Sequence, residues 1–236
     1  ALLHSIIVLE KRATLKSWVI ILSITSFTLS MCGTFLVRSG ILNSVHTFAN
    51  DPSRGVFILI FLFILIILSL VIFFFFFKDK NKDLNNFFLL SKETSILINN
   101  WFMMYFLSVV LIGTIYPIFL DVITNEKISV GPPFYHKLIV PFLIPFFIFM
   151  SLGPGLKWIK SNFENKNSLI VFFILSIMLS LFIIKNSTTD ILFYTVLVSV
   201  AFFLFFTTLK ELFIQKFKNT SQIIAHFGFS LLILSI

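Results

Sequence analysis

The chain has 236 residues, of which 58% are hydrophobic, 17% aromatic and only 12% charged, and its mean hydropathy is +1.04. Soluble domains carry about 45–50% apolar and about 25% charged residues, so this composition excludes a soluble core, a collagen-like chain and a disordered tail. The formal charge of +8 is spread over short loops, which argues against a nucleic-acid partner. With a single cysteine, Cys32, the chain holds no internal disulfide and no CxxCH haem attachment motif.

The apolar residues fall into successive runs along the chain, and most of these runs approach the ~20 residues that a membrane-spanning helix needs. The runs are 1–9, 17–37, 55–77, 101–120, 138–156, 169–184, 191–209 and 222–236. They lack the alternation of barrel strands, and only helices or closed barrels satisfy every backbone polar group in lipid. The sequence therefore predicts an all-α, polytopic transmembrane bundle with about six full spans, forming a single integral membrane domain over residues 1–236.

The two ends of the sequence suggest that it is a piece of a longer protein. The first residue is Ala1 rather than Met, and the last run, Leu231 to Ile236, stops within an apolar segment too short to cross a bilayer. We expect truncated helices at both ends.

Lysine and arginine predict the orientation of the spans, because cytoplasmic loops carry an excess of both. Of the 18 basic residues, 13 fall in the loops on one side of the membrane and 5 on the other. The basic side is predicted to be cytoplasmic. The loops 38–54, 121–137 and 185–190 are then predicted to face the periplasm or an equivalent outer compartment.

Two histidines lie inside apolar runs at matching depth. His4 precedes the charges Glu10, Lys11 and Arg12 by about six residues, and His226 follows Ser221 by about five, which places both roughly 7–9 Å from the cytoplasmic side. Ionisable residues within a span usually face a bundle interior or a functional site. Depth alone leaves two interpretations open. The pair ligates a haem iron from opposite faces, or each is a separate, hydrogen-bonded interhelical histidine.

His46 lies in the first outer loop, between Arg38 and Arg54. The loop mixes apolar residues with two arginines and an Asp51-Pro52 turn, so we expect it to fold back onto the membrane surface. The imidazole can serve as an axial ligand and either arginine can pair with a haem propionate. The alternative is an amphipathic interfacial loop whose arginines contact lipid phosphate.

The second outer loop contains Gly131-Pro132-Pro133, which predicts a rigid turn that breaks any helix. A substrate-facing platform is the alternative. His136, which follows it, is expected to be a solvated interfacial residue.

Several of these segments, in chain order, resemble the CcmF-type haem lyases of cytochrome c maturation. The matching segments are Ala1-Leu-Leu-His4-Ser, Glu10-Lys-Arg12, Gly33-Thr-Phe-Leu-Val-Arg-Ser-Gly40, Ser44-Val-His46-Thr-Phe, Asp51-Pro-Ser-Arg-Gly55, Lys127-Ile-Ser-Val-Gly-Pro-Pro133 and Ala225-His226-Phe-Gly228. The resemblance covers nearly the whole chain, and the run from Gly33 to Gly55 is its most specific part.

The resemblance implies roles for three histidines. His4 and His226 match the membrane histidines that bind haem b, and His46 matches the second of two outer histidines that hold the haem awaiting attachment. In the family the first outer histidine and a tryptophan-rich segment are expected just before the position of Ala1, and this sequence does not contain them. The isolated chain is therefore expected to be inactive.

The implied reaction adds the haem vinyl groups to the thiols of an apocytochrome c, and none of the residues present looks like a nucleophile or general base. The implied cofactor is haem b, with a second haem as transient substrate. The implied partners are a haem chaperone, apocytochrome c, other maturation subunits and membrane lipid, in the inner membrane of a bacterium or a mitochondrion. Two alternatives remain: a non-enzymatic haem carrier or transporter, and a structural assembly subunit that binds no haem.

Overall fold

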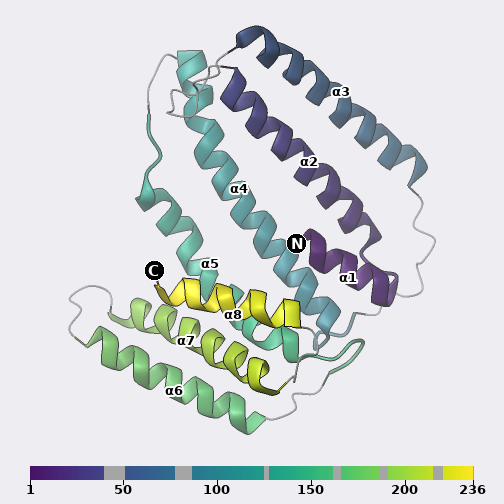
Figure 1. The fold of residues 1–236 in the computed structure, drawn as a ribbon. Helices are drawn as coiled ribbons and strands as arrows, with labels where there is room; N and C mark the ends of the chain where they lie inside the picture. The colour runs from purple at the N-terminus through teal and green to yellow at the C-terminus, as the bar shows by residue number, and fades with distance from the viewer. Residues whose placement is uncertain are drawn as a thin grey trace. The chain divides into compact units, whose positions relative to one another are not determined.

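The computed structural model describes residues 1–39, 51–77, 87–124, 128–161, 166–185, 191–214 and 220–235. These residues form a succession of α-helices (Figure 1). The helices are α1 (Leu2–Arg12), α2 (Lys16–Arg38), α3 (Pro52–Phe76), α4 (Lys92–Thr124), α5 (Pro132–Leu152), α6 (Lys166–Ile184), α7 (Ile191–Ile214) and α8 (Thr220–Ser235), with a 3-10 turn η2 (Gly153–Gly155) after α5.

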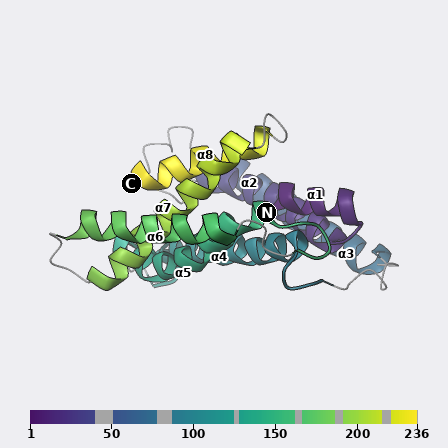
Figure 2. The same cartoon turned by 90° about the horizontal axis from the view of Figure 1, so that it is seen from below.

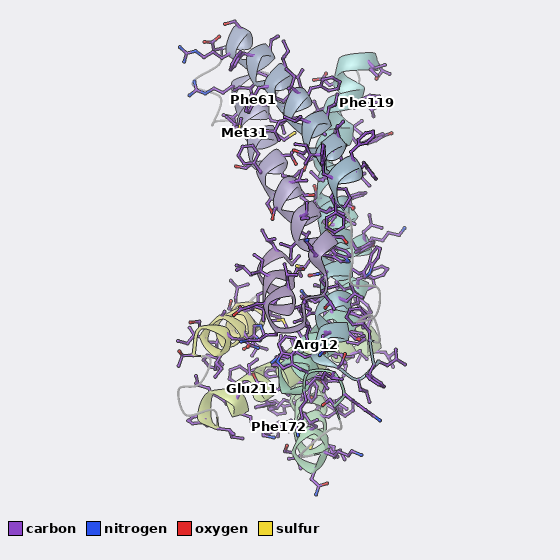
Figure 3. All side chains as sticks on the ribbon, turned by 90° about the vertical axis from the view of Figure 1, so that its right-hand side faces the viewer. Arg12, Met31, Phe61, Phe119, Phe172 and Glu211 are labelled. Carbon is purple, nitrogen blue, oxygen red and sulfur yellow. The ribbon has the colours of Figure 1, made fainter. Side chains whose placement is uncertain are left out.

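The prediction of an all-α, polytopic membrane protein is confirmed. Within the described ranges there is no strand, and 6 helices are long and apolar enough to cross a membrane. The helices at the two ends are shorter, with 11 residues in α1 and 16 in α8. Large apolar side chains point outward along the spans, among them Phe74 at 75% exposure and Leu192 at 83%, as expected for helices surrounded by lipid (Figure 3).

Helix α4 begins nine residues before the apolar run that predicted it. Ser91 caps it, since its hydroxyl accepts a hydrogen bond from the backbone N–H of Thr94 at 3.2 Å. Glu93 occupies the first turn, where a negative charge is favourable. The polar residues Asn99 and Asn100 continue the helix, and Asn100 is completely buried. The predicted span left out residues 92–100 because it was based on hydrophobicity alone, and this segment is mostly polar.

The rigid turn predicted at Gly131-Pro132-Pro133 is wrong, because the two prolines begin a helix. Helix α5 begins at Pro132, with Gly131 as its extended N-cap. Proline suits the first helical position, because its missing N–H would have no intrahelical partner there and its φ angle is already helical. His136 therefore lies within the second turn of α5, exposed as predicted.

The chain divides into two units, which are described separately. Unit 1 comprises Ala1–Asn86 and Leu111–Val130, and unit 2 comprises Phe87–Val110 and Gly131–Ile236.

In unit 1, α2 and α3 form an antiparallel pair. In Figure 3 the pair can be found by the labels of Met31, in α2, and Phe61, in α3. At one end, the Lys16 ammonium lies over the Phe77 ring, 5.6 Å from its centroid. At the other end, the backbone N–H of Asp51 donates to the carbonyl of Arg38 at 3.1 Å. The two ends of the loop 38–54 are therefore held together.

Gly55 permits this close approach of α2 and α3. A Cβ atom at position 55 would lie 2.9 Å from the Cα of Ser39, a backbone atom that cannot move aside cheaply. Small residues of this kind let membrane helices approach closely.

In unit 2, α7 is the central helix, with α5, α6 and α8 packed against it. Figures 1 and 2 both show α6 and α7 side by side. The core consists of Phe146 and Phe147 from α5 and Val200 and Leu204 from α7. Side chains of α4 and α8 cover it, including Phe102, Phe106, Phe229 and Ile233.

Small hydroxyl residues line the contact between α6 and α7. Ser176 and Ser180 of α6 are completely buried, and Ser199 of α7 is nearly so. Each donates to a carbonyl three residues earlier in its own helix, at 2.8, 2.9 and 2.8 Å respectively. The hydroxyls are thus satisfied locally, while their small size allows the helix backbones to come together.

The substitution Gly55→Ala should destabilise the α2–α3 pair by about 1–3 kcal/mol, because the new methyl group overpacks against the Ser39 backbone. Gly33→Ala in α2 is the matched control. It meets nothing within 4 Å and should stabilise by about 0.5–1 kcal/mol through backbone entropy. Thermal unfolding in detergent measures both, and an unchanged melting temperature for Gly55→Ala would contradict the close packing.

Candidate functional site

His226 lies in the second turn of α8, on the side of the helix that faces the protein. Ile223 and Ser230, three residues before it and four residues after it, are buried at 4% and 1% exposure. Residues at these spacings share one face of a helix. His226 itself is partly buried, and its Nδ1 atom has no contact with solvent.

Side-chain contacts hold α8 against α7 and α5. The hydroxyls of Thr208 in α7 and Ser230 in α8 share a hydrogen bond of 3.1 Å. One turn away, the rings of Phe205 and Phe227 lie 5.8 Å apart. Toward α5, the ring of Phe229 in α8 meets the ring of Phe147 edge to face, with 6.3 Å between the ring centroids. These contacts fix the side of α8 that turns toward the protein.

His4 occupies a similar position on α1, in unit 1. It is partly buried, and the adjacent Ser5 and Val8, four residues beyond His4, are completely buried. Helix α1 ends at Ala13, whose left-handed φ of 53° turns the chain back so that α1 packs on α2. His4 and His226 belong to different units, and their approach across the bundle stays a prediction.

Of the three residues predicted to bind haem in the loop 38–54, the structure describes the two arginines. His46 lies outside the described residues. Arg38 ends α2 and is partly buried, whereas Arg54 is exposed in the first turn of α3. The backbone hydrogen bond between Asp51 and Arg38 and the side-chain pair of Asp51 and Arg54 bring the two arginines to one end of the helical pair.

Asp51 organises this end through its carboxylate. It caps α3 by accepting from the Arg54 N–H at 3.2 Å, accepts from the Ser53 hydroxyl at 2.7 Å, and pairs with the Arg54 Nε at 3.0 Å. The hydrogen bond from Ser53, with the cap and the Arg54 charge, holds the pKa of Asp51 below its usual value. Asp51 therefore caps α3 at the predicted Asp51-Pro52 turn, and it also engages one nitrogen of Arg54.

Among the residues that the structure describes, no three His, Cys, Asp or Glu side chains gather in a group able to hold a metal ion. His4 and His226 each offer an imidazole. An imidazole nitrogen is a usual axial ligand of haem iron.

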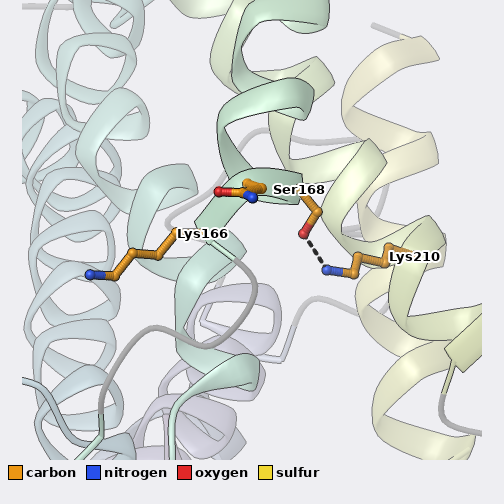
Figure 4. Close-up of a pocket in the computed structure, with 4 residues that line it drawn as sticks. Lys166, Ser168 and Lys210 are labelled. Carbon is orange, nitrogen blue, oxygen red and sulfur yellow. Dashed lines mark hydrogen bonds between the residues drawn. The ribbon is translucent and has the colours of Figure 1, made fainter.

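An open hollow lies at the start of α6 and the end of α7, in unit 2. It encloses about 540 Å³ and is lined by Lys166, Asn167, Ser168 and Lys210. The Lys210 ammonium donates to the Ser168 hydroxyl at 2.5 Å, and Lys166 extends away from both (Figure 4). Because the two ammonium groups do not converge, the hollow does not form a site for a single anion.

Sequence reasoning missed the polar contacts between the start of α4 and the loop after α5. Both carboxylate oxygens of Glu93, which is 3% exposed, accept from the Ile159 N–H at 3.0 and 3.1 Å. The Lys92 N–H donates to the Lys157 carbonyl at 3.0 Å, and the Lys92 ammonium lies over the Trp158 ring. The signal that could have placed the start of α4 here was a serine, Ser91, followed by an acidic residue, Glu93, as in an N-cap and first helical turn.

The comparisons with known proteins agree on one family. The Pseudomonas aeruginosa cytochrome c-type biogenesis protein CcmF is 43% identical over 158 residues, which are 67% of this chain and 24% of that protein. The Escherichia coli K12 CcmF is 37% identical over 182 residues, 77% of this chain and 28% of that protein. The Rhodobacter capsulatus cytochrome c-type biogenesis protein ccl1 is 40% identical over 162 residues, 69% of this chain and 25% of that protein.

The solved structure of a cytochrome c haem lyase CcmF matches 99% of this chain and 35% of its own, with a TM-score of 0.67 and 22% sequence identity. It therefore supports the fold. No family model matches the chain.

Fold and site together define a polytopic α-helical membrane protein with a partly buried histidine in each of two short helices, α1 and α8. By its relatives, the chain belongs to the CcmF family of cytochrome c-type biogenesis proteins. It spans about a quarter of the length of the curated relatives it matches.

The pairing of Asp51 should give the protein a weak pH dependence. Because its folded pKa is depressed, the stability it contributes is present above the ordinary aspartate pKa of about 3.9 and is lost as the pH falls through the folded value. Asp51→Asn keeps a capping oxygen and removes the charge. Its melting temperature should lie slightly below that of the unsubstituted protein near neutral pH, and the difference should vanish in acid.

Ser53→Ala is the companion variant, because it removes the hydroxyl donor and should return the pKa of Asp51 toward its usual value. A difference between Asp51→Asn and the unsubstituted protein that grows in acid would contradict this account.

Proposed function

We propose that this chain is the part of a cytochrome c haem lyase that binds haem b in the membrane and supplies one ligand for the haem to be attached. Support comes from the named role of its relatives in cytochrome c biogenesis and from the partly buried positions of His4 in α1 and His226 in α8. The second of these is the observation that carries the haem assignment, because ionisable residues in apolar segments usually face a bundle interior or a functional site.

In this proposal His4 and His226 are the two axial ligands of haem b, near the cytoplasmic side. The residues fit such a group, since each imidazole lies beside buried neighbours while part of it remains accessible. With Nδ1 of His226 buried, Nε2 is the nitrogen we assign to the iron. Haem b would supply the electron that keeps the delivered haem iron reduced.

His46 would hold the second haem, the substrate, at the outer face. Asp51 and Gly55 keep the two ends of its loop together, and Arg38 and Arg54 at those ends are the candidates to pair with propionates. Arg38 is the better placed of the two, because Asp51 already engages Arg54 Nε.

The reaction itself needs positioning more than acid–base catalysis. Each apocytochrome thiol adds across a haem vinyl group: sulfur bonds to one vinyl carbon, the thiol hydrogen goes to the other, and the C=C bond becomes single. No oxidant or reductant is consumed in this addition. The chain's contribution is to hold haem and thiols in the reacting geometry.

This proposal places the protein in the inner membrane of a bacterium, with the loop bearing His46 on the periplasmic side. Its partners would be the haem chaperone that delivers haem, the apocytochrome that receives it and other maturation subunits. The excess of basic residues in the opposite loops supports this orientation.

Replacing either His4 or His226 by Ala should abolish the absorbance of a six-coordinate, bis-histidine haem b in the purified membrane protein. His136→Ala is the matched control, since His136 is exposed in α5 and should leave the spectrum unchanged. The assignment fails if the spectrum survives both His4→Ala and His226→Ala, or if His136→Ala removes it.

His46→Ala should impair the attachment of the substrate haem without affecting the binding of haem b. We expect haem b absorbance to persist while covalent haem on a co-expressed apocytochrome c falls to background, in cells that lack other lyases. A cysteine placed at position 46 should react with a membrane-impermeant thiol reagent from the periplasmic side. Labelling from the cytoplasmic side would contradict the topology and the lyase proposal together.

A further inference from the structure

We infer that the hydrogen bond between Thr208 and Ser230 positions His226, by fixing the rotation of α8 about its axis. This inference rests on the proposed role of His226 as a haem ligand. The two hydroxyls belong to different helices and lie 3.1 Å apart, at 2% and 1% exposure. Both residues lie in unit 2.

Hydrophobic burial alone specifies this rotation poorly. The opposite side of α8 is also apolar, with Ile224 at 64% exposure and Leu232 at 54%. Lipid solvates such residues about as well as a protein interior does, so turning the helix changes the hydrophobic energy little. Successive residues of an α-helix are about 100° apart around its axis. A rotation of α8 by that angle would bring the His226 side chain to different neighbours.

The hydrogen bond resists such a turn because it is directional and joins two helices across their contact. Ser230 lies four residues after His226, on the same face of α8, so fixing one side chain fixes the direction of the other. The Ser230 hydroxyl is also within 2.7 Å of the Phe227 carbonyl of its own helix, which restricts its orientation.

Helix α7 is a suitable support for this contact. Its Leu204, one turn before Thr208, is completely buried in the core of unit 2. Thr208 lies within hydrogen-bond distance of the carbonyls of Leu204 and Phe205 at 2.9 and 3.0 Å, which orient its hydroxyl. The contact therefore fixes α8, which bears the proposed haem ligand, relative to the core of unit 2.

Thr207 provides a matched control on the same helix. It is also buried, at 6% exposure, but its described hydrogen bonds reach only the Phe203 and Leu204 carbonyls of its own helix, at 3.0 and 2.9 Å. Thr207→Val and Thr208→Val each remove one buried hydroxyl from α7 and keep its shape. Only the second removes a hydroxyl that bonds to α8.

The experiment measures haem binding by the full-length purified protein after haem removal, by titration with haem and by the optical and electron paramagnetic resonance spectra of the product. Thr208→Val should lower haem affinity about tenfold, the lower end of the cost of losing an outer-shell contact, and convert part of the low-spin signal to high-spin. Thr207→Val should change neither, and Thr208→Ser, which keeps the hydroxyl, should restore both.

Equal effects of Thr207→Val and Thr208→Val, or no effect of either, would overturn the inference while His226→Ala still abolished haem binding. If Thr208→Val fails to give a monodisperse protein, Ser230→Ala removes the partner hydroxyl without adding bulk and is judged by the same criteria. If the unsubstituted protein shows no haem spectrum that depends on His226, the proposed function fails and the inference fails with it.

Discussion

The constraint on which this structure depends is the absence of water around the spans. Every backbone N–H and C=O inside lipid needs a partner within the chain, and a helix provides one for each. The same constraint acts on side chains. The hydroxyls along the spans turn back to carbonyls of their own helix, as Ser176, Ser180 and Thr207 do. A hydroxyl that also reaches a second helix, such as Thr208, is therefore the exception that specifies how two helices meet.

The two proposed haem-binding regions are supported by different means. The histidines of α1 and α8 depend on the direction in which a helix face points, which packing determines and, for α8, a hydrogen bond to α7 supports. The outer histidine belongs to a connection whose ends are held by backbone contact, at the Asp51 N–H and Arg38 carbonyl and at Gly55 against Ser39. In both regions the contacts that provide support lie in helices or at their ends, where side-chain geometry is better defined than within loops.

Much of this organisation could be predicted from the sequence because apolar length and charge are strong signals in membranes. The spans, the short helices at the two ends and the exposure of His136 followed from the residues themselves. The start of α4 could not be predicted in this way, because its first turns are polar and are held by contacts with residues some 60 positions away, such as Glu93 with Ile159. Such contacts depend on tertiary structure, which a hydrophobicity window does not contain. The misinterpretation of Pro132 has a local cause: proline ends a helix from within but begins one readily at its first position.

The buried carboxylate of Glu93 has a consequence for how the helices of unit 2 are arranged. An ionised carboxylate is costly to bury unless it is hydrogen-bonded, and Glu93 meets this requirement with both oxygens on one backbone N–H of the loop after α5. The contact joins the start of α4 to the end of α5, beside Gly153, which lies directly against the Ser95 side chain. Helices α4 and α5 both supply aromatic residues to the core that supports α7, among them Phe102 and Phe146 at 5.8 Å. The polar contacts outside the span and the aromatic contacts within it therefore act on the same pair of helices, and through α7 on the helix that bears His226.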